Sequence, residues 1–189
     1  MAAKGIKGFS GLRIWPVTAN TASTYAVGEK IDVPTAVSAT TDRKSEDYEL
    51  PADDGIYDSG SEFTSEDLEI IVQELPLDLE AKLDGASFDD ETGVYSWGPE
   101  TAVAPNYALG FRALKRDGTY RMIQYYYGKV TSIKIDYKTR TDNKDGSRHT
   151  IHMTMFPRLA DGQHVRKKDT VTGSDLIWLN TVDAIPVGG

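Results

Sequence analysis

The segment NYALGFRALKRDGTYRMIQYYYGKV, residues 106–130, constrains the fold more than any other part of this sequence. Asp117 and Gly118 separate two runs that are rich in aromatic and β-branched residues. An Asp-Gly pair supplies the positive φ angles that a tight type I′ turn requires. The segment therefore predicts a β-hairpin.

Large side chains lie on both faces of the second arm of this hairpin. Because side chains alternate along a strand, Tyr126 shares a face with Met122, whereas Tyr125 and Tyr127 occupy the opposite face. A strand with water on one side normally shows a polar row there. We therefore expect a second packing layer, either a helix predicted over residues 76–84 or a neighbouring subunit, and we assign Tyr125 and Tyr127 to packing between subunits.

The remaining periodicity predicts a single domain over residues 1–189 that is mainly β. About eight strand candidates and one convincing helix favour a β-sandwich or barrel with a short helix on its side. The helix is expected over residues 76–84, because Leu75, Leu79 and Leu83 recur with helical spacing, Pro76 suits the first turn and Gly85 suits the end. The other expected parts are an N-terminal arm over 1–10, a long acidic loop over 42–61 and a C-terminal extension over 170–189.

Composition excludes several kinds of chemistry. The chain has no cysteine, and neither phosphate-binding glycine motif occurs. His149 and His152 point to opposite faces of one expected strand, so they do not share a metal. The acids of the long loop lack the spacing of a calcium-binding loop. We therefore expect no cofactor, no metal site and no enzyme, although a hydrolase with carboxylates that the sequence does not locate stays open.

Charge is divided unevenly along the chain. Residues 1–100 hold 21 Asp and Glu against 7 Lys and Arg, whereas residues 101–189 hold 8 against 14. This division is compatible with head-to-tail attraction between identical subunits, or with two halves that mix in the fold. The overall pI of about 4.9 disfavours a dedicated nucleic-acid binder. The sequence also has no apolar run long enough for a membrane span and no signal peptide, so a cytoplasmic origin is expected.

Six pieces of sequence, in this order, resemble the major tail proteins, or tail tube proteins, of long-tailed non-contractile bacteriophages of Gram-positive hosts. They cover most of residues 5–160, and their order and spacing carry the resemblance: KGFSGLRIWPVT, YELPADDGIYDSG, ELPLDLEAKLDG, GVYSWG, VAPNYALGFRALKRDGTYRMIQYYYGKV and KTRTDNKDGS. The sequence from residue 161 onward matches this family only loosely.

The resemblance implies a structural subunit that forms hexameric rings, which stack into a hollow tube for DNA. It implies that the loop over 42–61 contacts the next ring, and the candidate contacts are Asp47, Tyr48, Glu49, Asp53, Asp54 and Tyr57. It also implies further partners: a tape measure protein in the lumen, tail terminator and distal tail proteins at the ends, and double-stranded DNA that passes without specific binding. The expected location is the virion tail, assembled in the host cytoplasm.

Two other functions stay open beside this one. A β-sandwich module that binds carbohydrate or a cell surface would be a monomer with a concave aromatic face. A tube subunit of a phage-tail-like bacteriocin would share the sequence features of a virion tail protein.

Overall fold

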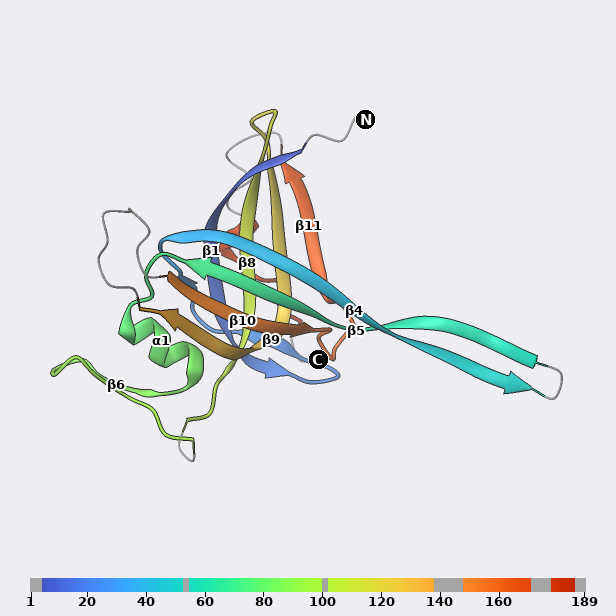
Figure 1. Ribbon diagram of the computed structural model, residues 1–189, viewed down its shortest axis with the longest axis horizontal. Coiled ribbons are helices and arrows are strands. Elements are labelled where there is room, and N and C mark those ends of the chain that lie inside the picture. The colour runs from blue at the N-terminus through green and yellow to red at the C-terminus, as the bar shows by residue number, and fades with distance from the viewer. Residues whose placement is uncertain (1–4, 53–54, 100–101, 138–147, 171–177, 186–189) are drawn as a thin grey trace.

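The computed structural model describes residues 5–52, 55–99, 102–137, 148–170 and 178–185. Their main feature is one curled antiparallel sheet with the strand order β2-β1-β8-β9-β10-β5-β4, to which β3 and β11 add at β1 and β9 (Figure 1). A separate pair, β6 and β7, lies below the helix α1. The prediction of a mainly β chain with one short flanking helix is confirmed for these residues.

The elements follow one another along the chain with these bounds: β1 Ile6–Asn20, β2 Tyr25–Val27, β3 Ile31–Asp32, β4 Ala36–Ala52, β5 Gly55–Val72, α1 Leu77–Asp84, β6 Ser87–Asp89, β7 Val94–Ser96, β8 Asn106–Lys115, β9 Tyr120–Asp136, β10 Arg148–Phe156 and β11 Val165–Thr170.

The predicted hairpin is formed by β8 and β9, but its turn differs from the expected type. Gly118 has a φ of 86°, and Asp117 is not among the residues with positive φ. The Gly118 amide donates to the Lys115 carbonyl at 3.1 Å, and the Lys115 amide donates to the Thr119 carbonyl at 2.8 Å. Three residues therefore connect the strands, as in a type I turn closed by a glycine in the left-handed region. The type I′ prediction is wrong because one positive φ, rather than two, closes this loop.

The helix α1 agrees with the sequence signals at both ends. Pro76 is its N-cap, and Gly85 ends it in the left-handed conformation with a φ of 75°. A Cβ atom at Gly85 would lie 2.3 Å from the Val103 carbonyl oxygen, so a side chain does not fit there. Leu79 and Leu83 are buried and attach the helix to the sheet.

Two hydrophobic cores lie on opposite faces of the sheet. The inner core is enclosed by the curl and includes Leu109 and Tyr125. The outer core combines Trp15, Tyr126 and Val182. The chain itself therefore supplies a layer on each face: α1 adds Leu79 and Leu83 to the inner core, and β2 and residues 178–185 cover the outer core. Residues 178–185 belong to the expected C-terminal extension, and they pack on the sheet.

Two of the expected segment boundaries are wrong. The strand β1 begins at Ile6, which is paired with Lys115, so residues 6–10 of the expected N-terminal arm belong to the sheet. Residues 1–4 lie outside the described residues. Residues 42–61 are not a loop, because β4 and β5 continue through them as a hairpin up to the pair of Ala52 and Gly55. This hairpin extends beyond the body of the molecule, so it has no buried face and shows no apolar alternation that would mark it as strand.

Tyr126→Ala should destabilise the isolated chain more than Tyr127→Ala. The Tyr126 side chain is 1% exposed in the outer core, whereas Tyr127 is only half-buried. Truncating a buried aromatic ring typically costs about 3–5 kcal/mol in the free energy of unfolding. Denaturant unfolding of both variants measures this difference, and equal losses would contradict the assignment of Tyr126 to a core.

Candidate assembly surface

The hairpin of β4 and β5 changes character halfway along its length. From Glu66 to Val72, β5 also pairs with β10, so this half belongs to the body of the sheet. From Gly55 to Ser65, β4 is its one partner among the described residues, and the two strands form a projecting arm (Figure 1). The register shifts between Lys44 and Ser45, where the arm leaves the body. We call the part of β4 and β5 beyond this point, residues 45–65, the distal arm.

A buried carboxylate fixes the root of the distal arm. Glu66 is 3% exposed, and it accepts a hydrogen bond from the Tyr125 hydroxyl at 2.8 Å. Its second oxygen lies 3.0 Å from Nε2 of His164 and 3.5 Å from Nε of Arg43. Burial alone would raise the pKa of Glu66, but the hydrogen bonds from Tyr125 and His164 and the charge of Arg43 hold that pKa below its usual range. The carboxylate is therefore buried in its charged form.

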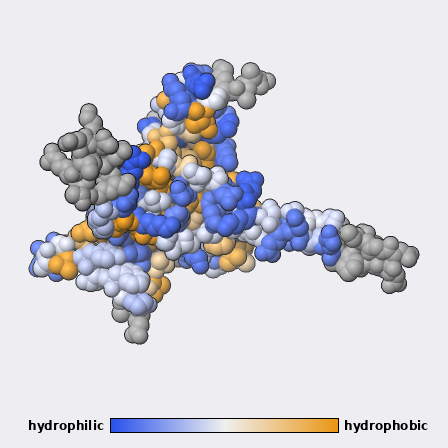
Figure 2. Space-filling view, viewed as in Figure 1, coloured by the Kyte–Doolittle hydropathy of each residue, from blue (hydrophilic) through white to orange (hydrophobic). Residues whose placement is uncertain are grey.

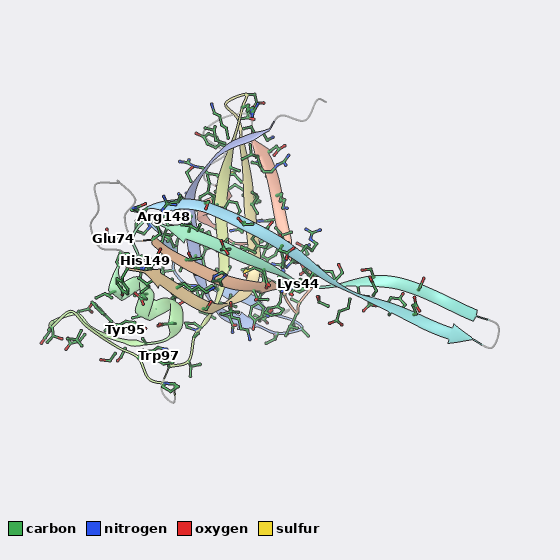
Figure 3. The ribbon with its side chains drawn as sticks, in the orientation of Figure 1. Lys44, Glu74, Tyr95, Trp97, Arg148 and His149 are labelled. Atoms are coloured by element: carbon green, nitrogen blue, oxygen red, sulfur yellow. The ribbon has the colours of Figure 1, made fainter. Side chains whose placement is uncertain are left out.

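Further contacts on the neighbouring residues reinforce this root. Lys44 forms an ion pair with Asp67, which also accepts a hydrogen bond from the Thr154 hydroxyl at 2.8 Å. The Phe63 ring packs against the His164 ring with 4.6 Å between centroids. Figure 3 shows Lys44 at the place where the hairpin leaves the sheet. The direction of the arm is thus set by side chains from β4, β5 and β10 and from the segment before β11.

The distal arm carries a one-sided charge. Residues 45–62 hold seven Asp and Glu and no Lys or Arg. Among the candidate ring-to-ring contacts, Asp47, Tyr48 and Glu49 are exposed on β4. Asp53 and Asp54 lie outside the described residues, and Tyr57 lies in β5 where side chains are not described. The structure therefore places the first three on one exposed strand of the arm.

The Tyr48 side chain also stabilises the arm. Tyr48 faces Gly60 across the hairpin, and a Cβ atom at Gly60 would lie 2.7 Å from the Tyr48 hydroxyl oxygen. The ring therefore lies over the glycine and still leaves 39% of the residue exposed. An aromatic residue across from a strand glycine covers backbone that would otherwise be bare.

The tyrosines assigned to packing between subunits differ in position. Tyr125 is 1% exposed in the inner core, and its hydroxyl donates a hydrogen bond to Glu66. The inter-subunit role of Tyr125 stays a prediction. Tyr127 is half-buried, and its role stays a prediction.

A second site combines acidic and aromatic side chains beside α1. Glu80, Asp84, Tyr95 and Trp97 line a cavity of about 500 Å³. Burial and the nearby charge of Asp84 raise the pKa of Glu80, although the His149 imidazole opposes this. Figure 3 shows Tyr95 and Trp97 below the helix and His149 above it.

The two carboxyl groups of this second site differ in their hydrogen bonding. One oxygen of Asp84 accepts a hydrogen bond from the Tyr95 hydroxyl, and the other accepts one from the Ala86 amide at 3.1 Å. Oε2 of Glu80 is buried and has no hydrogen-bond partner among the residues that the structure describes. Asp84 is thus held in place by the fold, which does not suit a freely attacking carboxylate, whereas Glu80 lines the same cavity and keeps one buried oxygen unsatisfied.

Neither a metal cluster nor a membrane helix is found in the described parts of the chain. No three His, Asp or Glu side chains there are grouped to hold a metal ion. None of the helical structure described is long and apolar enough to cross a bilayer. No protein-family model matches the sequence, and no curated protein does. Any function must therefore be argued from the geometry of the chain.

Tyr125→Phe should weaken the fold in a way that depends on pH. A hydrogen bond to a charged group contributes about 1.5–3 kcal/mol, and the variant loses the one to Glu66. The pKa of Glu66 is lowered by folding, so this contribution is present above its unfolded value of about 4.3 and is lost as the pH falls through the folded value. The loss in the free energy of unfolding of this variant should be complete at pH 7 and should shrink below about pH 4.

Denaturant unfolding across this pH range measures the deficit. Tyr127→Phe is the control, because the structure gives the Tyr127 hydroxyl no hydrogen bond within the described residues. A deficit that is the same at pH 3 and pH 7 would show that Glu66 is not the partner that matters.

Glu80→Gln should stabilise the chain at pH 7. The pKa of Glu80 is raised by folding, so the wild-type protein loses stability as the pH rises from the unfolded value through the folded one. The amide removes this charge, and we expect a gain of about 1 kcal/mol, the lower end of the cost of an unsatisfied buried group. Melting temperatures at pH 4 and pH 7 test this, with the exposed Glu91→Gln as control. A loss of stability at pH 7 would indicate that the carboxylate has a partner.

Proposed function

We propose that this protein is a structural subunit of a phage tail tube and assembles with copies of itself into stacked hexameric rings. The observation that carries the proposal is the distal arm. A two-stranded ribbon is at best marginally stable in water, and it needs a third strand or a covering layer. The described residues supply neither to the arm, yet Glu66 and its partners hold its root rigidly. A two-stranded ribbon that is anchored at its root but uncovered along its length fits a segment that packs against another subunit.

Open strand edges also support an assembling subunit. The outer edge of β4, the last strand in the sheet order, has no strand beside it within the described residues. Unpaired edges are sites where a further chain can pair, and closure into a ring removes them. The number six comes from the resemblance of the sequence to tail tube proteins, as do the tape measure, tail terminator and distal tail proteins as partners and the virion tail as location.

The acidic composition fits a conduit for DNA. A net charge of −8 per subunit denies DNA the counterion release that drives binding, so double-stranded DNA would pass without adhering. The same arguments apply to the tube of a phage-tail-like bacteriocin, which shares the assembly and lacks the DNA.

A binding module is the second candidate function, and one observation favours it. The Trp97 residue is 55% exposed beside the cavity that Glu80 lines, and an exposed indole with a carboxyl group free to hydrogen bond suits a carbohydrate or a cation. Such a module would remain a monomer at high concentration.

Removing the distal arm should abolish self-association and leave the fold intact. Ser45 and Phe63 face each other across the hairpin, so replacing residues 46–62 with Asn-Gly joins them by a two-residue turn. Because the deleted residues lie outside both cores, we expect an unchanged circular dichroism spectrum and a melting temperature close to that of the wild type. Sedimentation should then show a monomer where the wild type associates.

The matched control shortens the other projecting hairpin in the same way. Asp89 and Val94 pair across β6 and β7, so replacing residues 90–93 with Asn-Gly shortens this hairpin at its tip. This control should associate like the wild type. An arm-deleted chain that still associates would remove the arm from the assembly surface, and an unfolded one would place the arm in the core.

A further inference from the structure

A groove opens between the two ends of the curled sheet. The Val33 amide donates to the Leu12 carbonyl at 3.0 Å, and from this contact β1 and β4 diverge. The space between them is a cavity of about 450 Å³, lined by residues 6–9 of β1, residues 37–41 of β4 and side chains of β8, β9 and β11. Its wall exposes backbone edges of β1 and β4 that pair with no strand in the described parts of the chain.

The interior of this groove is apolar. Phe9, Phe111 and Ile123 lie in it, and their rings and methyl groups continue the inner core outward. At its rim, Ile6 is 55% exposed and Val37 is 43% exposed. Figure 2 shows orange, apolar surface between β4 and the tip of the β8–β9 hairpin. An apolar face of this kind marks an interaction site on a soluble protein.

The surroundings of the groove are cationic. Arg121 and Lys167 line it directly. Arg121 shares the carboxylate of Asp169 with Lys115, so these three cations are set against one acid at this border. An occupant should therefore combine apolar side chains with negative charge.

We propose that the groove of one copy receives the distal arm of a second copy of this chain, a step that rests on the proposed assembly of this protein. The arm provides the matching chemistry, with seven acids and no cation over residues 45–62. It also exposes two aromatic residues, Tyr48 at 39% and Phe63 at 36%. Figure 2 shows the described part of the arm as polar surface on the opposite side of the molecule from the β6–β7 hairpin.

The arm of the same chain does not reach its own groove. Thr41 is part of the groove wall, and Lys44, three residues further along β4, is held to Asp67 at the root of the arm. The strand β4 therefore forms the groove wall and then continues into the arm. The ion pair of Lys44 with Asp67 directs the arm away from the groove. The occupant must come from another molecule.

This pairing is heterologous, because the arm and the groove are different surfaces. Each copy offers one of each, so the contact repeats from subunit to subunit and builds an extended assembly instead of a closed dimer. The arm gains a cover for its aromatic side chains, and the groove loses its exposed apolar rim. Opposite charges then select the orientation.

Cysteine cross-linking tests the contact directly, since the chain has no cysteine of its own. One variant carries Ser59→Cys on the exposed face of the arm, and a second carries Val37→Cys at the groove. The two are mixed and treated with a bifunctional maleimide that has a flexible spacer. The matched control replaces Val37→Cys with Val94→Cys, on the β6–β7 hairpin, where the valine is 53% exposed. Mass spectrometry measures the yield of mixed dimer, and sedimentation of the same samples measures association.

The proposal predicts a mixed-dimer yield several-fold higher for the Ser59 and Val37 pair than for the control. Salt at about 1 M reduces the screening length to about 3 Å and should lower that yield. Equal yields in samples that associate would overturn the docking of the arm in the groove and leave the proposed assembly standing. Equal yields without any association, at the highest concentration reached, would overturn both.

Discussion

Strand β9 is the constraint on which the rest of the structure depends. It is 17 residues long, and it pairs with β8 along one edge and with β11 and then β10 along the other. Its consecutive tyrosines, Tyr125 and Tyr126, enter different cores on opposite faces of the sheet. Because neither face can be left in water, the sheet must curl around one and the chain must return over the other. The curl and the docking of residues 178–185 both follow from this strand.

The same strand sets up the projecting arm. Tyr125 reaches from β9 across the inner core to Glu66 on β5, where a charged carboxylate is buried because three side chains compensate it. That point is the last at which β5 has a neighbour on both edges. Beyond it, the two strands leave the body with acids and no cations. The proposed contact with another molecule rests on this fixed root and on the uncovered, charged ribbon beyond it.

Much of the architecture could be predicted from local sequence. The helix was predicted from Pro76, Gly85 and the spacing of Leu79 and Leu83, and its observed bounds agree within one residue. These signals are local: a proline in the first turn, a glycine with positive φ and one apolar face. The β8–β9 hairpin was also predicted from a local signal, the Asp117-Gly118 pair between two strand-like runs. The loop length was not, because it depends on whether Asp117 as well as Gly118 has a positive φ.

The candidate site was harder to predict, because its contacts are distant in sequence. Alternation shows that Tyr125 and Tyr126 face opposite ways, but it does not show that residues 178–185 cover one of them. Glu66 continues the inward row of Leu68 and Ile70 by one step, which is the one local signal in the sequence that this acid is buried. Its partner His164 lies 98 residues away, and only the folded sheet brings them together.

The central claim is that this chain completes itself by assembling with its own copies. Negative-stain electron microscopy of the purified full-length protein over a wide range of concentrations tests it most directly. The account predicts rings with a central opening at high concentration, and stacks of such rings as the concentration rises. Particles of single-chain size at every concentration and ionic strength would contradict it.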